Sequence, residues 1–286
     1  MQSPILHEQT ARAIKRQLAH PANSLILHGP KGVGKDYVAE HLARQLLSIA
    51  KLDADMHYVR IDPSDKGSIS IESIRQVVDF LRLKVPGANN TIQRVVHISS
   101  ADTMTIEAQN ALLKTLEEPP ADTVLLLCVS DLQQMLSTIL SRSQQLRIEV
   151  PSFAQIRAGM QPNNVALFDR NIQLSGGLPG LLYALDTQAA HPLVNAIEYA
   201  KQFISVNHYQ RLIMVNNLQN ANIEVKDFLW AIERIARIGQ QSAAQKGNDA
   251  AVQKWQAVRK QATKIDNLLG ANASNKLALT SLSLHI

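Results

Sequence analysis

A glycine-rich loop is the first feature of this sequence whose residue types and spacing could do chemistry. It reads GPKGVGKD, follows the apolar segment 24–28 and precedes a segment with apolar residues every four positions. Strand, glycine loop and helix in that order are the setting of a phosphate-binding P-loop, because backbone N–H groups and the helix N-terminus all attract an anion. The candidate binding residues are Gly29, Gly32, Gly34 and Lys35. The loop is retained either for packing or for weak binding of nucleotide or another anion.

An arginine between two serines is the second candidate. Arg142 follows the short helical segment 137–140 and lies between Ser141 and Ser143. A guanidinium carries a fixed positive charge and a planar fork of donors, which suits it to phosphoryl oxygens. The alternative is a surface ion pair between Arg142 and a nearby acid such as Glu149.

The stretch 108–148 connects this arginine to a known family. Its segments QNALLKTLEEPP and TILSRSQ resemble the clamp-loader branch of the AAA+ ATPases, and within that branch the delta-prime family of bacterial DNA polymerase III. The resemblance implies that Arg142 is catalytic in trans, acting on ATP held by a neighbouring subunit. The family's Ser-Arg-Cys motif reads Ser141-Arg142-Ser143 here, so the arginine is kept and the cysteine is not.

The same resemblance implies that this chain lacks its own ATPase parts. Asp36 replaces the hydroxyl residue that follows the P-loop lysine and binds Mg²⁺ in related ATPases. Ser99 and Ser100 stand where the family has two carboxylates, and a serine hydroxyl is no general base at neutral pH without activation. Leu181 replaces the lid arginine. We therefore expect no intrinsic ATP hydrolysis.

Alternating strand and helix patterns must position these residues. Predicted strands at 24–28, 57–61, 94–98 and 124–129 alternate with helices, which favours a parallel sheet covered on both faces. A turn is predicted at Pro86–Asn90, and Pro151 marks a boundary. From about His191 onward only helical periodicity is present. The expected fold is α/β: an AAA+ P-loop domain at 1–150, a helical lid at 151–187 and an all-α collar at 188–286.

Composition limits the other possibilities. The chain has 286 residues, which favours two or three domains, and only 4% are aromatic, so the cores must be mainly aliphatic. Its one cysteine, Cys128, can form no intramolecular disulfide and no cysteine-rich zinc site, and is expected to be buried. His28, His57 and His97 lack the spacing of a metal pair. Many delta-prime relatives carry a four-cysteine zinc insert, but the corresponding interval here has no cysteine. No metal and no cofactor are expected.

Charge and hydropathy indicate the setting of the protein. The formal net charge is +5, and it falls entirely on residues 188–286, which permits DNA nearby without requiring contact. The N-terminus has no signal-peptide pattern, and no run of eighteen apolar residues is present. A soluble cytoplasmic protein with no membrane association is expected.

The resulting expectation is a non-catalytic, delta-prime-like clamp-loader subunit that belongs to the DNA polymerase III holoenzyme. The resemblance implies a hetero-oligomer with gamma/tau motor subunits, a delta subunit and a sliding clamp, with primer–template DNA contacted through the complex. Two alternatives stay open. One is an ATP-hydrolysing motor subunit of the gamma/tau type, and the other is a stand-alone AAA+ adaptor outside replication.

Overall fold

Two compact units make up the chain in the computed structural model, which describes residues 3–52, 55–82, 92–163, 165–218, 220–270 and 274–285. The first unit is Met1–Met160 with Leu178–Gly180, and the second is Gln161–Gly177 with Leu181–Ile286. The predicted division at 150 and 187 stays a prediction, since residues 151–187 are shared between the two units. The predicted turn at Pro86–Asn90 lies outside the described residues.

A parallel sheet forms the centre of the first unit, as the sequence predicted. Every paired strand in it is parallel, and the order is β2-β3-β4-β1-β5. The strands are β1 (Ser24–His28), β2 (Tyr58–Ile61), β3 (Arg94–Ile98), β4 (Thr123–Val129) and β5 (Gln144–Arg147). Both β3 and β4 are buried along their whole length, as is typical of central strands in a parallel sheet that is covered on both faces.

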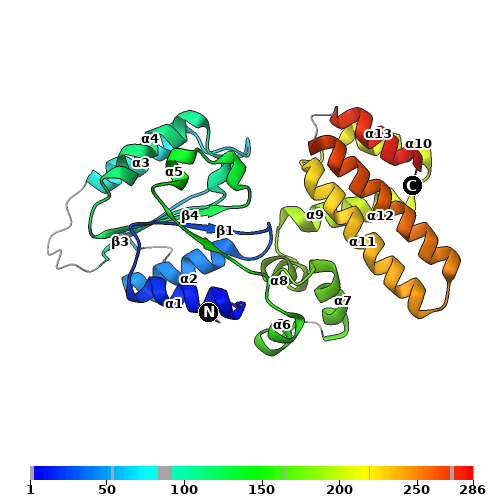
Figure 1. The fold of residues 1–286 in the computed structure, drawn as a ribbon, viewed down its shortest axis with the longest axis horizontal. Coiled ribbons are helices and arrows are strands. Elements are labelled where there is room, and N and C mark those ends of the chain that lie inside the picture. The colour runs from blue at the N-terminus through cyan, green and yellow to red at the C-terminus, as the bar shows by residue number, and fades with distance from the viewer. Residues whose placement is uncertain are drawn as a thin grey trace. The chain divides into compact units, whose positions relative to one another are not determined.

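Helices cover both faces of this sheet, with α1 and α2 on one face and α3, α4 and α5 on the other (Figure 1). The helices and short 3₁₀ turns of the first unit are α1 (Glu8–Ala19), α2 (Lys35–Leu47), α3 (Ile71–Arg82), η1 (Ala101–Thr103), α4 (Ile106–Glu117), η2 (Leu132–Gln134), α5 (Ser137–Leu140) and α6 (Phe153–Gly159). This arrangement is the α/β class that the alternation of elements predicted.

Alternation along the strands assigns each side chain to one face. Val96 and Leu125 pack in the core that contains Ile74 of α3 and Leu112 of α4. Their neighbours in sequence point the other way, toward α2. His97 of β3 and Cys128 of β4 therefore share the α2 face of adjacent strands, and both are fully buried. The burial of Cys128 confirms the expectation from the sequence.

Every regular element that the structure describes in the second unit is a helix. Its helices are α7 (Val165–Ser175), α8 (Pro179–Thr187, whose first two residues belong to the first unit), α9 (Pro192–Ser205), α10 (His208–Asn217), α11 (Val225–Gln245), α12 (Asp249–Gly270) and α13 (Asn275–His285). Helix α11 packs on α12 and α9, and α10 packs on α13. Phe203 and Phe228 meet edge to face with ring centroids 5.1 Å apart in this core. Among the described helices, none is both long and apolar enough to cross a membrane.

Candidate functional site

The glycine loop has the backbone geometry that its sequence predicts. Gly34 lies immediately before α2 with φ at +95°, a conformation that side chains with a Cβ rarely adopt. Gly180, at the start of α8, approaches the loop so closely that a Cβ there would lie 2.8 Å from the Gly32 carbonyl oxygen. Gly34 is therefore needed for the left-handed turn before α2, and Gly180 for the close backbone contact between this loop and the segment Leu178–Gly180.

Lys35, the predicted phosphate-binding lysine, is buried and held by its own loop. Its Nζ donates to the carbonyl oxygens of Gly29, at 3.0 Å, and Pro30, at 3.2 Å, and to Ser130 Oγ, at 2.9 Å. An ammonium has three donors, so these three acceptors account for all of them. Burial lowers the pKa of Lys35, and the nearby Asp36 partly opposes that shift. In this conformation the ammonium stabilises the loop instead of extending from it.

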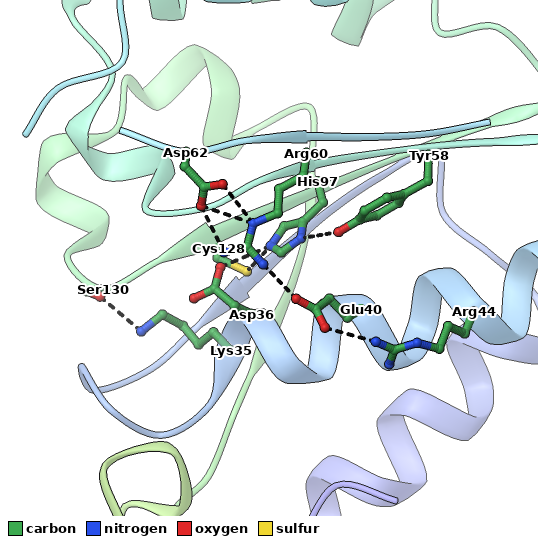
Figure 2. Close-up of polar contacts among 10 residues, drawn as sticks. All are labelled: Lys35, Asp36, Glu40, Arg44, Tyr58, Arg60, Asp62, His97, Cys128 and Ser130. Carbon is green, nitrogen blue, oxygen red and sulfur yellow. Dashed lines mark hydrogen bonds and ion pairs between the residues drawn. The ribbon is translucent and has the colours of Figure 1, made fainter. Parts of the chain in front are cut away.

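Asp36 is bound into a cluster with side chains from the sheet (Figure 2). Its Oδ1 lies 3.1 Å from His97 Nε2, and the same ring nitrogen lies 3.5 Å from Cys128 Sγ. The other ring nitrogen, Nδ1, lies 2.8 Å from the hydroxyl of Tyr58. Burial raises the pKa of Asp36, but hydrogen bonds with His97 and Ser99 outweigh it, so that the pKa lies below its ordinary value. The Asp36 carboxylate is therefore ionised and engaged within the protein.

The positions that a working ATPase needs do not fit Mg²⁺ and ATP here. Ser99 is buried and hydrogen-bonded to Asp36, and Ser100 adopts a left-handed backbone conformation ahead of η1. Leu181 is fully buried and offers no charge. Since Lys35 and Asp36 are both engaged internally, the residues that would hold a metal–nucleotide complex are absent or occupied by other contacts.

Arg142 lies two residues after α5 and pairs with an acid that the sequence did not single out. Its Nη2 is 2.8 Å from Glu117 Oε1, and its Nη1 donates to the carbonyl oxygen of Thr138 at 3.1 Å. The alternative of a surface ion pair with an acid of the same chain is therefore confirmed, but the acid is Glu117; Glu149, the example named from the sequence, pairs with Arg147 at 3.1 Å. Strand geometry explains the difference: Arg147 ends β5 beside Glu149, whereas Arg142 precedes that strand. About a third of the Arg142 side chain is exposed, at 35%.

Ser143, which replaces the family's cysteine, makes its own contact. Its Oγ lies 2.7 Å from Ser24 Oγ at the start of β1. This pair joins the segment after Arg142 to the central sheet, because β1 and β5 are neighbouring strands. The main chain at Arg142 is therefore anchored on both sides, by the Arg142 N–H, which donates to the carbonyl oxygen of Ile139 at 3.1 Å, and by the Ser143 hydroxyl.

Sequence reasoning treated Asp36, His97 and Cys128 separately and missed their association. The signal was present in the strand alternation, which places His97 and Cys128 on one face of two adjacent strands. Their position opposite the first turn of α2 depends on the sheet order, which no single segment specifies. Of the other histidines, His57 pairs with Asp55 at 3.0 Å, and burial lowers the pKa of His28.

Known proteins resemble this chain in sequence and in fold. The family described as DNA polymerase III, delta subunit, matches residues 5–152. DNA polymerase III subunit delta′ of Pseudomonas aeruginosa is 32% identical over 182 residues, covering 56% of this chain and 55% of that protein. The Escherichia coli delta′ subunit is 27% identical over 224 residues, covering 69% and 65%. The matched stretch thus spans about half to two thirds of these relatives. A gamma subunit-related protein of Thermotoga maritima shares the fold, with a TM-score of 0.51 and 20% identity over 96% of this chain and 97% of that protein.

Proposed function

This chain belongs to the DNA polymerase III delta subunit family, and from that premise we propose that it is a clamp-loader subunit of the delta-prime type, which hydrolyses no ATP itself. In this role it takes part in a hetero-oligomer with gamma/tau-type motor subunits and a delta subunit. The complex places a sliding clamp on primer–template DNA during replication. The whole-protein role extends beyond the matched stretch and is part of the proposal.

One asymmetry carries this proposal. The groups that would act on a nucleotide bound by this chain are engaged internally or replaced, as Lys35, Asp36 and Ser99 illustrate. Arg142, the group that can act on a neighbour's nucleotide, is kept and partly exposed. Loss of every role in ATP chemistry would not explain why Arg142 is kept while the groups for this chain's own nucleotide are not.

Arg142 is proposed as an arginine finger that acts in trans. Its guanidinium would approach the γ-phosphate of ATP in an adjacent motor subunit, where negative charge must be stabilised during phosphoryl transfer. The anchored backbone on either side of Arg142 supports this role, since a preorganised donor loses less entropy when it meets its target. The ion pair with Glu117 is half-exposed and therefore weak enough to be exchanged for a phosphate.

Reconstitution tests the function directly. The chain is mixed with gamma/tau-type motor and delta subunits from the same organism, and the assembly is measured by native mass spectrometry. A stable complex containing one copy of this chain, with DNA-stimulated ATPase that requires its presence, is the expected result. A gamma/tau-type motor would instead hydrolyse ATP alone, so turnover by the isolated chain would overturn the non-catalytic assignment. A chain that joins no such complex would overturn the clamp-loader role.

A further inference from the structure

We propose that Asp36, His97 and Cys128 form a binding site for a transition-metal dication of the zinc class, inside the first unit beneath the glycine loop. These three residues offer an oxygen, a nitrogen and a sulfur ligand, and their ligand atoms all lie within 4.8 Å of one another. No family role of the P-loop requires a histidine or a cysteine here. The proposal does not depend on the clamp-loader assignment.

The distances match the edges of a tetrahedral zinc site. Zinc binds sulfur at about 2.3 Å and imidazole nitrogen at about 2.0–2.1 Å, so a tetrahedron places these two ligands about 3.6 Å apart, and nitrogen and carboxylate oxygen about 3.3 Å apart. The structure has Cys128 Sγ 3.5 Å and Asp36 Oδ1 3.1 Å from His97 Nε2. These two distances are therefore within a few tenths of an ångström of the values around a bound metal, and the third, between Cys128 Sγ and the Asp36 carboxylate, is no longer than 4.8 Å.

Tyr58 supplies the outer contact that a metal-binding histidine needs. Its hydroxyl lies 2.8 Å from His97 Nδ1, on the side of the ring that faces away from the proposed metal. Without metal, the Tyr58 hydroxyl donates to Nδ1, and the Nε2–H donates to Asp36. With metal, the ring takes the other tautomer: Nδ1–H donates to the Tyr58 oxygen, and the Nε2 lone pair binds the metal.

Of the two neighbouring cations, Arg60 is paired with acids, whereas Lys35 keeps its positive charge and donates its hydrogen bonds to uncharged groups away from the three ligands. Arg60 pairs with Asp62 at 2.8 Å and with Glu40 at 2.6 Å, while the Lys35 ammonium is directed to Ser130 (Figure 2). Binding forms one metal–sulfur, one metal–nitrogen and one metal–oxygen bond. The Cys128 thiol releases its proton to solvent, so the thiolate and the Asp36 carboxylate together balance the two positive charges of the metal.

Access and ligand type together decide which metal enters. His97 and Cys128 are fully buried, whereas 41% of the Asp36 side chain is exposed and offers a path from solvent. Three protein ligands leave the fourth tetrahedral position for water. Thiolate and imidazole favour zinc or cobalt over magnesium, which prefers six oxygen ligands. Asp36, which stands where related ATPases have the Mg²⁺-binding hydroxyl residue, is thus part of a site that prefers zinc or cobalt.

Cobalt titration of the full, tag-free chain tests this site. The protein is treated with chelator and reductant and titrated with Co²⁺, and the cobalt is then displaced with Zn²⁺. One equivalent should bind with thiolate-to-cobalt charge-transfer absorption and tetrahedral d–d bands, one proton should be released, and excess Mg²⁺ should not compete. Absence of saturable binding, a spectrum without the thiolate band or equal competition by Mg²⁺ would overturn the proposal.

Single substitutions identify the ligands. His97→Gln and Cys128→Ala should weaken binding at least about 100-fold, and Tyr58→Phe, which removes only the outer contact, about 10- to 100-fold. His57→Gln is the matched control, because it alters another histidine–aspartate pair and should leave affinity unchanged. Circular dichroism of each metal-free variant checks folding. If a substitution of the buried His97 or Cys128 prevents folding, Asp36→Asn, at the partly exposed ligand, tests the site in its place. Unchanged affinity in folded Asp36→Asn and Cys128→Ala, or equal loss in His57→Gln, would refute the site.

Discussion

Arg142 and Glu117 form an ion pair between the end of α5 and the last residue of α4, with Nη2 and Oε1 2.8 Å apart. The proposed finger is therefore held by an acid of its own chain until it meets another negative group. Because both side chains are partly exposed, such a pair contributes only about 0.2–1 kcal/mol. It can position the guanidinium without preventing its transfer to a phosphate.

Substitution of Arg142 tests the finger. Arg142→Ala should leave folding and assembly nearly unchanged but lower the DNA-stimulated ATPase and the clamp-loading rate of the reconstituted complex several-fold. Arginine fingers elsewhere contribute about 10³–10⁵ in rate, and one finger among several motor interfaces should show less. Arg142→Lys should restore activity only in part, since an ammonium lacks the planar fork. Arg147→Ala, which removes a nearby guanidinium paired with Glu149, is the control; full activity of Arg142→Ala would make this arginine a bystander.

Release of Arg142 from Glu117 tests the resting pair. Glu117→Gln should change the free energy of unfolding by no more than about 1 kcal/mol and raise the ATPase of the complex by at most about 5-fold. Urea unfolding and steady-state ATPase measure the two effects, and Glu118→Gln controls for the loss of one negative charge at this position. If Glu117→Gln lowered the ATPase as much as Arg142→Ala, then Glu117 would orient Arg142 for the reaction and would not merely bind it in the resting state.

Nucleotide binding by the isolated chain should be weak and unproductive. Calorimetry with Mg-ATP is expected to show at most weak binding, with no turnover above background. Lys35→Met should leave this result unchanged and lower the free energy of unfolding by about 1–3 kcal/mol, because Lys35 donates to Gly29, Pro30 and Ser130. Lys31→Met, in the same loop, is the comparison. Sub-micromolar, Mg²⁺-dependent ATP binding that Lys35→Met abolishes would show that the loop is a working site.

Acid should weaken the buried pair Arg94–Asp122, which joins the beginnings of β3 and β4 at 2.8 Å. Burial raises the pKa of Asp122, but hydrogen bonds from Arg94 and Thr123 outweigh it and hold the pKa below its ordinary value. This carboxylate therefore stabilises the fold above the unfolded-state pKa of about 3.9, and the contribution is lost as pH falls through the lower folded-state pKa.

Asp122→Ala measures this contribution. It should lower the free energy of unfolding at pH 7 by about 3–5 kcal/mol, since it leaves a buried guanidinium without its carboxylate, and it should flatten the decline in stability below about pH 4. Urea titrations at several pH values give both numbers. Asp79→Ala removes an exposed pair with Arg82 and should do neither. If the free energy of unfolding of Asp122→Ala fell with pH as it does in the unchanged protein, the acid dependence would come from other carboxylates.

Exposed apolar side chains on two packed helices should mediate assembly. Tyr209 of α10 and Leu277 of α13 are each 73% exposed, in the region predicted to be the collar. Tyr209→Ser combined with Leu277→Ser should weaken entry into the reconstituted complex about 10-fold or more, with little change in the thermal midpoint, because tyrosine is a typical interface anchor and exposed apolar surface marks interaction sites. Met56→Ser removes a comparably exposed apolar side chain from the first unit and is the control. Normal assembly of the double variant would place the contacts elsewhere.

The sequence by itself determined the elements of the fold and most of their bounds. Strands β1 and β3 have the bounds predicted from the sequence, and helices α11 and α12 occupy the residues that their periodicity predicts. These features are local: a run of apolar residues or a repeat of 3.6 residues stays with its own segment. The P-loop glycines and Arg142 were found for the same reason, since each belongs to a contiguous motif.

Only the tertiary structure decided which side chains from separate segments meet. Arg142 pairs with Glu117 and not with Glu149, which is nearer in the sequence. The reason is that α4 and α5 pack together while Arg147 lies beside Glu149. His97 reaches both Asp36 and Cys128 because β3 and β4 are neighbours in the sheet and α2 covers the face they share. Strand order and helix placement follow from how the whole core packs, and a contact between residues 61 positions apart cannot be read from either segment alone.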